Sequence, residues 1–235
     1  MLKYILTLMA ILSMNFSAEA QTIHQNSGWL FLMNITKFND KWGMHFDLQI
    51  RTQNEWEGVR NLLVRPGITY YINKNSDVTL GYLLTPTFIN AEGVLKNTLT
   101  EHRIWEQYIY KHKINAVNVS HRFRLEQRFI ERNAPEDLFS QRLRYFVRFI
   151  IPIKSGKESF EKGFFAALQN EVFLNVQHKN ELNGSIFDQN RAYGATGYRF
   201  NKKIDLEAGY MNQSVKGLGQ NTSNHIIQLA FYTRF

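Results

Sequence analysis

The most informative stretch of the sequence is HIIQLAFYTRF, residues 225–235. Its alternate residues form one mostly apolar face, which consists of Ile227, Leu229, Phe231, Thr233 and Phe235. An alternation with period two is typical of a β-strand whose two sides meet different surroundings. The last strand of a soluble β-sandwich and the closing strand of a β-barrel both satisfy this pattern.

The terminal aromatic residue favours the barrel. A strand that alternates in this way and ends on Phe resembles the targeting strand of bacterial outer-membrane barrels. In that class the last strand closes the sheet, and the barrel-assembly machinery reads its terminal Phe during insertion. The resemblance implies a C-terminal targeting signal that includes Phe231 and Phe235.

The N-terminal residues predict export. Lys3 precedes an apolar stretch at residues 4–14, and Ala18-Glu19-Ala20 ends the segment. This order is typical of a secretory signal peptide, so we expect residues 1–20 to be removed and residues 21–235 to form a single β-barrel domain. The apolar stretch is shorter than the roughly 20 residues that a membrane-spanning helix needs. Because the sequence has no cysteine, lipidation of the N-terminus and disulfides are excluded, which leaves the periplasm, the outer membrane or the medium.

Composition narrows the class of protein further. The chain has 28 Lys and Arg against 20 Asp and Glu, and 14% of its residues are aromatic. A basic chain can bind nucleic acid, but export argues against that partner. Single all-β domains often have this length. We therefore expect one all-β domain that binds no nucleic acid.

Segments of alternating polarity recur along the chain, each close to the roughly 9 to 11 residues that cross an outer membrane at a tilt. Eleven can be counted, at residues 29–36, 42–52, 61–72, 78–87, 101–111, 117–131, 139–151, 164–175, 187–200, 204–214 and 224–235. A closed bacterial barrel with both ends in the periplasm needs an even number of strands. We therefore take eleven as a miscount and expect an antiparallel transmembrane β-barrel of 10–12 strands. Either one long segment hides two strands, or residues 29–36 lie outside the closed sheet.

The connections between these segments alternate in length. Short connections are predicted at residues 37–41, 73–77, 112–116 and 201–203, and longer ones at 88–100, 176–186 and 215–223. Short periplasmic turns and longer external loops are typical of outer-membrane barrels. Two connections fit less well, because 152–163 is longer and 133–138 is shorter than this asymmetry predicts.

Two neighbouring segments, residues 117–131 and 139–151, separate charged from apolar side chains. One face of the second segment carries Leu143, Tyr145, Val147, Phe149 and Ile151, and the other carries Arg142, Arg144, Phe146 and Arg148. A soluble sandwich would turn the charged row to water. In a membrane barrel, lipid offers no hydrogen-bond partners, so the charged row faces the lumen. The same separation recurs at residues 42–52, which favours the barrel.

The alternation predicts an Arg-rich lumen with a charge network. Its members are Arg122, Arg124, Glu126, Arg128, Arg142, Arg144, Arg148, Glu171, Arg191 and Glu207. Guanidinium groups stay charged and need carboxylates, amides, water or an anion as partners. Because like charges on neighbouring strands repel one another, we expect interior ion pairs centred on Glu126 and Glu171.

The Arg-rich strand pair carries a family resemblance. The stretch HRFRLEQRF at residues 121–129, followed by RLRYFVRF at 142–149, resembles the domain-of-unknown-function 2490 family, as do Gln169-Asn170-Glu171 and Gln189-Asn190-Arg191. The similarity extends from about residue 29 to residue 235. Members are exported, predicted outer-membrane barrels without an assigned activity. The resemblance implies architecture and location, and it supplies no catalytic residues.

An enzyme is a separate class, since some small outer-membrane barrels are lipid hydrolases with Ser and His at the membrane rim. His225 lies near the external end of the last predicted strand, and Ser214 and Ser223 lie near it in the sequence, but none belongs to a nucleophile motif. Ser120 and His121 are adjacent, so on a strand they face opposite sides and cannot act as nucleophile and base on one face. His45 and Asp47 share a face, but two such residues occur together often by chance. We predict neither catalytic residues nor a cofactor or metal site.

Three functions remain after these exclusions. The first is a structural or small-solute barrel with a narrow or plugged lumen, embedded in outer-membrane lipid. The second is a pore that prefers small anionic solutes, because an Arg-lined constriction favours anions. The third is a lipid hydrolase at the barrel rim or an accessory subunit of an envelope assembly.

Overall fold

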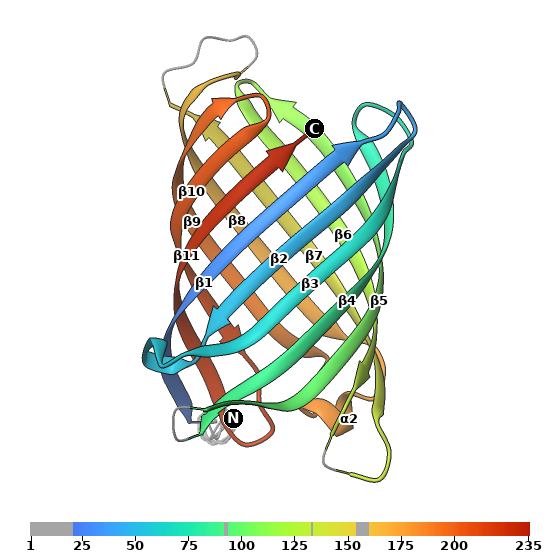
Figure 1. The fold of residues 1–235 in the computed structure, drawn as a ribbon, viewed down its shortest axis with the longest axis vertical. Helices are drawn as coiled ribbons and strands as arrows, with labels where there is room; N and C mark the ends of the chain where they lie inside the picture. Colours follow the sequence, from blue (N-terminus) through green and yellow to red (C-terminus); the bar gives the residue numbers. More distant parts are fainter. Residues whose placement is uncertain (1–20, 92–93, 133, 154–159) are drawn as a thin grey trace, which may run out of the picture.

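The protein is a closed β-barrel of eleven strands (Figure 1). A computed structural model describes residues 21–91, 94–132, 134–153 and 160–235. The predicted signal peptide, residues 1–20, lies outside the described residues. The strands are β1 (Thr22–Lys37), β2 (Trp42–Thr52), β3 (Val59–Tyr71), β4 (Ser76–Ala91), β5 (Val94–Ile114), β6 (Val117–Ile130), β7 (Leu138–Pro152), β8 (Gly163–Asn175), β9 (Phe187–Asn201), β10 (Ile204–Val215) and β11 (Asn221–Arg234).

Strand β1 pairs with β11 in parallel, and this pair closes the barrel. All other neighbouring strands are antiparallel and consecutive in the chain. The parallel register places Leu30 beside Leu229 and Leu32 beside Phe231. The interpretation of eleven as a miscount is therefore wrong. An odd number of strands closes here because the first and last strands run in the same direction, so the evenness argument does not apply, and residues 29–36 lie inside the sheet.

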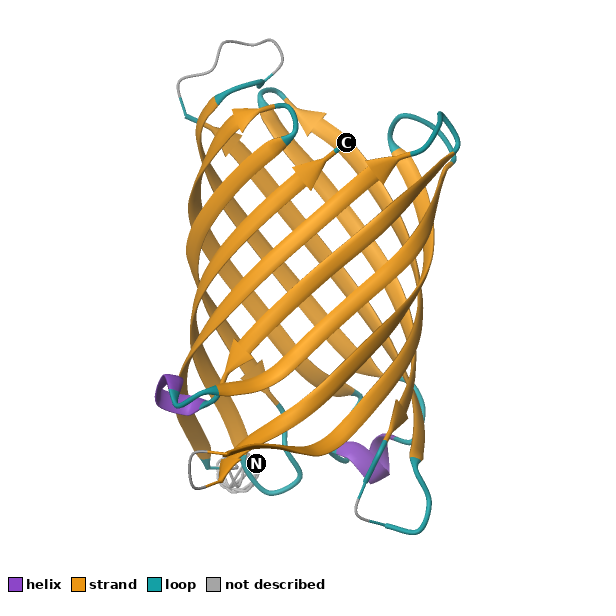
Figure 2. Ribbon diagram, viewed as in Figure 1, coloured by secondary structure: helices purple, strands orange, loops and turns teal. Residues whose placement is uncertain are grey.

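The two ends of the barrel differ in their connections. We call the end where β1 and β11 finish the upper end, as drawn in Figure 1, and the opposite end the lower end. Upper connections are short at residues 38–41, 72–75, 115–116 and 202–203, whereas the connection at 153–162 is longer. The lower end carries a 3-10 turn, η1 (Asn54–Trp56), and a short helix, α2 (Lys179–Leu182) (Figure 2).

One predicted loop is wrong. Residues 88–100 are mostly strand, because β4 and β5 continue past the expected strand ends as a long hairpin. A register shift between Thr87 and Phe88 precedes the extension. Such a bulge bends the strand pair and increases its twist. Asn90, Gly93 and Asn97 make this stretch look like a loop in the sequence, but pairing with a neighbouring strand stabilises residues of low strand propensity.

Side chains alternate between an apolar outer wall and a polar interior. Large apolar residues exposed on the outer wall include Leu80, Ile104, Phe123, Leu143, Leu168, Leu206 and Leu229. Buried charged residues point inward, among them Arg124, Glu126, Arg144 and Glu207. Within the described residues, no helix is long and apolar enough to cross a membrane.

Small apolar clusters pack inside the barrel between the charged rows. Trp105 is fully buried against Leu63 and Leu83. Gly81 makes room for the indole, since a Cβ atom there would lie 2.2 Å from the Trp105 ring. A second cluster contains Trp29 together with Tyr193, Met211 and Ile226. These clusters hold the inward side chains in place without closing the whole interior.

Candidate functional site

The lumen contains a cavity of about 1390 Å³, which is the candidate site. Its lining includes residues near the upper end, such as Lys111 and Arg234, and residues near the lower end, such as Arg60 and Arg128. Sixteen lining residues are Lys or Arg and five are Asp or Glu. The cavity therefore follows the barrel from end to end and carries a large excess of positive charge.

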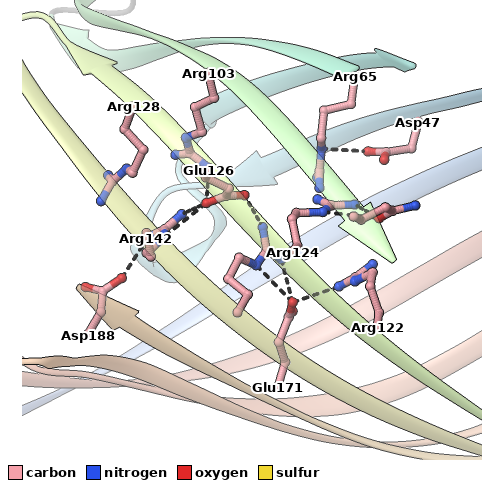
Figure 3. A network of polar contacts seen from close by, with 12 residues as sticks. Asp47, Arg65, Arg103, Arg122, Arg124, Glu126, Arg128, Arg142, Glu171 and Asp188 are labelled. Atoms are coloured by element: carbon pink, nitrogen blue, oxygen red, sulfur yellow. Dashed lines mark hydrogen bonds and ion pairs between the residues drawn. The ribbon is translucent and has the colours of Figure 1, made fainter. Parts of the chain in front are cut away.

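Glu126 on β6 is a buried carboxylate at the first centre of the network (Figure 3). Its side chain is 1% exposed. Arg142 donates to its Oε2 from Nε and Nη2 at 3.0 and 2.7 Å, and Arg144 donates from Nη1 to its Oε1 at 2.5 Å. Arg103 Nη1 lies 3.8 Å from Oε2. One buried carboxylate thus compensates three guanidinium groups from the two strands that flank β6.

Glu171 on β8 is the second centre, and Arg144 joins it to the first. Arg144 donates to Glu171 Oε1 from Nε and Nη2 at 2.9 and 2.7 Å. Arg122 Nη2 donates to the same oxygen at 2.7 Å. Arg144 therefore uses its whole donor fork on two carboxylates, a geometry that a lysine could not reproduce.

Two carboxylates of the network are missing from the sequence-based prediction. Glu101 binds Arg103 and Arg128, with Nε to Oε1 distances of 2.7 and 2.6 Å. The sequence could have predicted the role of Glu101, since residues two apart on a strand share a face and Arg103 follows Glu101 by two residues. Asp188 Oδ2 accepts from Arg142 Nη1 at 2.7 Å. Asp188 falls at a register shift opposite residues 173 and 174, where the pairing skips it, so a strict alternation misplaces its side chain.

A separate group of ion pairs lies on β9, β10 and β11. Glu207 binds Arg148 of β7 and accepts from the Tyr193 hydroxyl at 2.9 Å. Asp205 binds Arg199 at 2.8 Å and Arg234 at 2.7 Å. Glu207 is therefore not part of the Glu126 and Glu171 group, although the alternation predicts its lumenal position correctly.

Two predicted members of the network have no carboxylate partner among the described residues. Arg124 lies directly opposite Arg144 and donates instead to the amide oxygen of Gln107, at 3.2 and 2.7 Å. Its guanidinium carbon lies 4.3 Å from the centre of the Trp105 ring. Arg191 donates to Gln189 Oε1 at 3.1 Å. Amides and aromatic faces therefore take the place of carboxylates for these two arginines.

The family model named Protein of unknown function (DUF2490) matches residues 26–224. The chain belongs to this family. The matched region of the DUF2490 protein begins within β1 and ends within β11, so it contains the whole of strands β2 to β10. Phe231 and Phe235 lie beyond the matched region. No curated protein and no solved structure matches the chain.

The side chains considered for catalysis have other hydrogen-bond partners in this DUF2490 protein. His225 Nδ1 meets the Tyr210 hydroxyl at 2.6 Å on the outer wall, and Ser223 accepts from Asn212. Ser120 lines the cavity, whereas His121 contacts Tyr145 outside. Among the described residues, no hydrogen bond joins a Ser to a His at these positions.

The His45 and Asp47 pair is part of another ion pair. His45 Nε2 lies 2.9 Å from Asp47 Oδ2, and Arg65 Nε lies 2.9 Å from Asp47 Oδ1. In the part of the DUF2490 protein that the structure describes, no three His, Cys, Asp or Glu residues gather in a metal-binding group. The chemistry of the lumen is therefore that of guanidinium groups, which recognise oxyanions through directed hydrogen bonds.

Proposed function

We propose that the protein is an outer-membrane β-barrel whose narrow basic lumen admits small anions. The observation that carries this proposal is the cavity that follows the barrel with an excess of Lys and Arg along its lining. Positive charge in a confined space with low-dielectric walls raises the local concentration of anions. Rings of Arg and Lys have the same effect in anion-selective pores.

The outer wall supports the membrane setting. Its polar side chains contact one another, as hydrocarbon surroundings require. Asn170 pairs with Asn190 at 3.1 Å, and Glu106 accepts from Gln127 at 3.1 Å. Apolar residues cover much of the remaining wall.

Tyr and His side chains gather near both ends of this wall. Tyr110, His112 and His121 stack near the upper end, with 5.2 Å between the two imidazole centres. Tyr210 and His225 stack near the lower end, 6.1 Å apart. Amphipathic aromatic rings at two levels are typical of the two membrane–water interfaces. The wall between them would then face the lipid.

A barrel with a plugged lumen is the second candidate, and the position of Arg144 favours it. This side chain bridges β6 and β8 through Glu126 and Glu171, so it places an ion-pair layer inside the barrel. Such a layer narrows the cross-section. Conductance distinguishes a narrow pore from a plug.

Two measurements test the proposed function. The mature protein is expected in outer-membrane fractions, with migration on gels that changes on heating. The refolded protein is placed in a planar bilayer under a KCl gradient. Its reversal potential is expected to have the sign that a greater permeability to chloride than to potassium produces. Recovery in the soluble periplasm would overturn the membrane setting. A folded, inserted protein without conductance would favour the plugged barrel. A reversal potential whose sign indicates a greater permeability to potassium would contradict anion preference.

A further inference from the structure

Arg51 and Arg191 share one aromatic ring inside the lumen. Their guanidinium carbons lie 3.9 and 5.1 Å from the centre of the Trp29 ring, and both side chains line the cavity. Within the described residues, neither guanidinium has a carboxylate oxygen within 4.0 Å. Arg51 donates to Gln49 Oε1 at 3.1 and 2.6 Å, and Arg191 donates once to Gln189. Most of their donors therefore lack a charged acceptor.

The carboxylate nearest to Arg191 in the sheet is already used. Glu171 is its register partner on β8, but Glu171 Oε1 accepts from Arg122 and Arg144. Two cations that share a ring and form no direct ion pair repel each other, and the repulsion destabilises the empty barrel. A protein that retains such an arrangement at a cavity wall presents a site that an anion completes.

An apolar stripe on β1 continues from this site. Phe31, Met33 and Ile35 follow Trp29 on the inward face and line the same cavity. The neighbouring inward residues of β2 are polar or charged, namely Gln49, Asp47 and His45. The stripe from Trp29 to Ile35 is about 20 Å long at the usual rise per strand residue. The cavity therefore offers a basic group and an apolar surface side by side.

We propose that this place binds an amphipathic organic anion. The oxygen atoms of its carboxylate or phosphate group lie between Arg51 and Arg191 over Trp29, and its apolar body lies along Phe31, Met33 and Ile35. The inference rests on the proposed function, because it names the class of anion that the basic lumen takes. It adds a defined site to the general charge of the lining.

Calorimetric titration of the refolded full-length mature protein in a neutral detergent tests the site with three soluble probes. Octanoate has both a negative charge and an apolar chain, whereas inorganic phosphate has only the charge. Octanol has only the apolar chain, so it measures partition into the detergent micelle. Octanoate is expected to saturate one site per chain. Phosphate is expected to bind at least tenfold more weakly, and octanol is expected to give only the micelle background.

Variants separate the two parts of the site. R51Q and R191Q are each expected to weaken octanoate binding at least tenfold, which corresponds to about 1.4 kcal/mol, because each removes charged hydrogen-bond donors. M33Q is expected to weaken octanoate while leaving phosphate unchanged, whereas M33L keeps the apolar volume and the octanoate affinity. R132Q, at the lower rim, is the matched charge control. Heat-modifiable migration verifies folding, which R51Q and R191Q retain because neither removal leaves a carboxylate unpaired.

Three results would overturn the inference. Octanoate binding that survives in the folded R51Q and R191Q variants would place the head group elsewhere. Equal affinities for octanoate and phosphate, unchanged in M33Q, would reduce the site to a simple anion site. Octanoate heats equal to those of octanol would leave only detergent partition. Chloride preference in the bilayer depends on the remaining Lys and Arg of the lining, so it persists if this site fails.

Discussion

Arg144 Nη1 lies 2.5 Å from Glu126 Oε1, between two side chains that are each about nine-tenths buried or more. The same guanidinium binds Glu171, so this contact links the two centres of the lumenal network. Neither carboxylate could lose its charge without leaving several guanidinium groups uncompensated. The contact is therefore the point at which the interior is most sensitive to substitution.

Glu126→Gln is expected to destabilise the barrel strongly. Removing one partner of a buried pair costs about 3 to 5 kcal/mol, and water in the lumen lowers this value. Urea unfolding followed by heat-modifiable migration measures the loss. The matched control is Glu181→Gln, because Glu181 pairs with Arg132 at the exposed lower rim, where a pair contributes about 0 to 1 kcal/mol. Equal midpoints for the two variants would contradict a stabilising network.

Glu171→Gln is expected to lower the unfolding temperature and to increase anion conductance. The change frees Arg122 and Arg144 at the cavity wall and removes a negative charge from it. If the ion pairs also narrow the lumen, their loss widens the path. Thermal unfolding and single-channel recording on one preparation measure both effects. A silent substitution, together with solvent labelling that finds Arg144 in contact with bulk water or lipid, would contradict the assignment of the inward face.

Leu143→Arg is expected to block membrane insertion. Leu143 is exposed on the outer wall, between the inward residues Arg142 and Arg144. An Arg that faces mid-bilayer lipid costs roughly 2 to 4 kcal/mol. Folding into lipid vesicles, with Leu143→Val as the control, measures the effect. Normal folding of the Arg variant would favour a barrel whose outer wall faces water.

Phe235→Ser and deletion of Phe235 are expected to lower the amount of assembled protein without changing synthesis. Phe235 also belongs to the closing seam, since its amide donates to Ile35 O at 2.8 Å and its carbonyl accepts from Lys37 at 2.6 Å. The backbone bonds persist in Phe235→Ser, so this variant tests the aromatic ring alone. Pulse-labelling followed by outer-membrane fractionation measures assembly. Normal assembly of both variants would show that the C-terminal resemblance has no targeting role.

Cysteine pairs can verify the parallel seam directly, because the sequence contains no native cysteine. Leu32 and Phe231 are register partners on the outer wall, so Leu32→Cys with Phe231→Cys is expected to form a disulfide. Leu32→Cys with Ile227→Cys is the control, since Ile227 pairs with Gly28 in the parallel register. Mobility on non-reducing gels reports both pairs. Efficient bonding of the control alone would contradict this register of the seam.

The sequence pattern was sufficient to predict which side chains of a strand point into the lumen and which point outward. The alternation in β6 and β7 correctly separates Arg144 from Leu143, and eleven segments were visible in the chain. The argument that the number of strands must be even nevertheless replaced the count of eleven strands with an expected range of 10–12. That argument assumes antiparallel closure, which depends on two strands from opposite ends of the chain.

The sequence did not predict which carboxylate binds each arginine. Arg122 binds Glu171 49 residues later, and Arg148 binds Glu207 59 residues later. Such pairs reach across the lumen or skip a strand, so they depend on barrel curvature and shear. Arg191 forms no ion pair among the described residues although Glu171 is its register partner, because Glu171 binds Arg122 and Arg144.

The all-β class, the Arg-rich interior and the apolar outer wall follow from the sequence alone, because the period of two is a local property of an extended chain. The parallel pairing of β1 with β11, the partner of each guanidinium and the place of Arg51 and Arg191 beside the apolar stripe appear only in the folded barrel. These features depend on residues that closure of the sheet brings together. Local alternation contains no information about which distant strand becomes a neighbour.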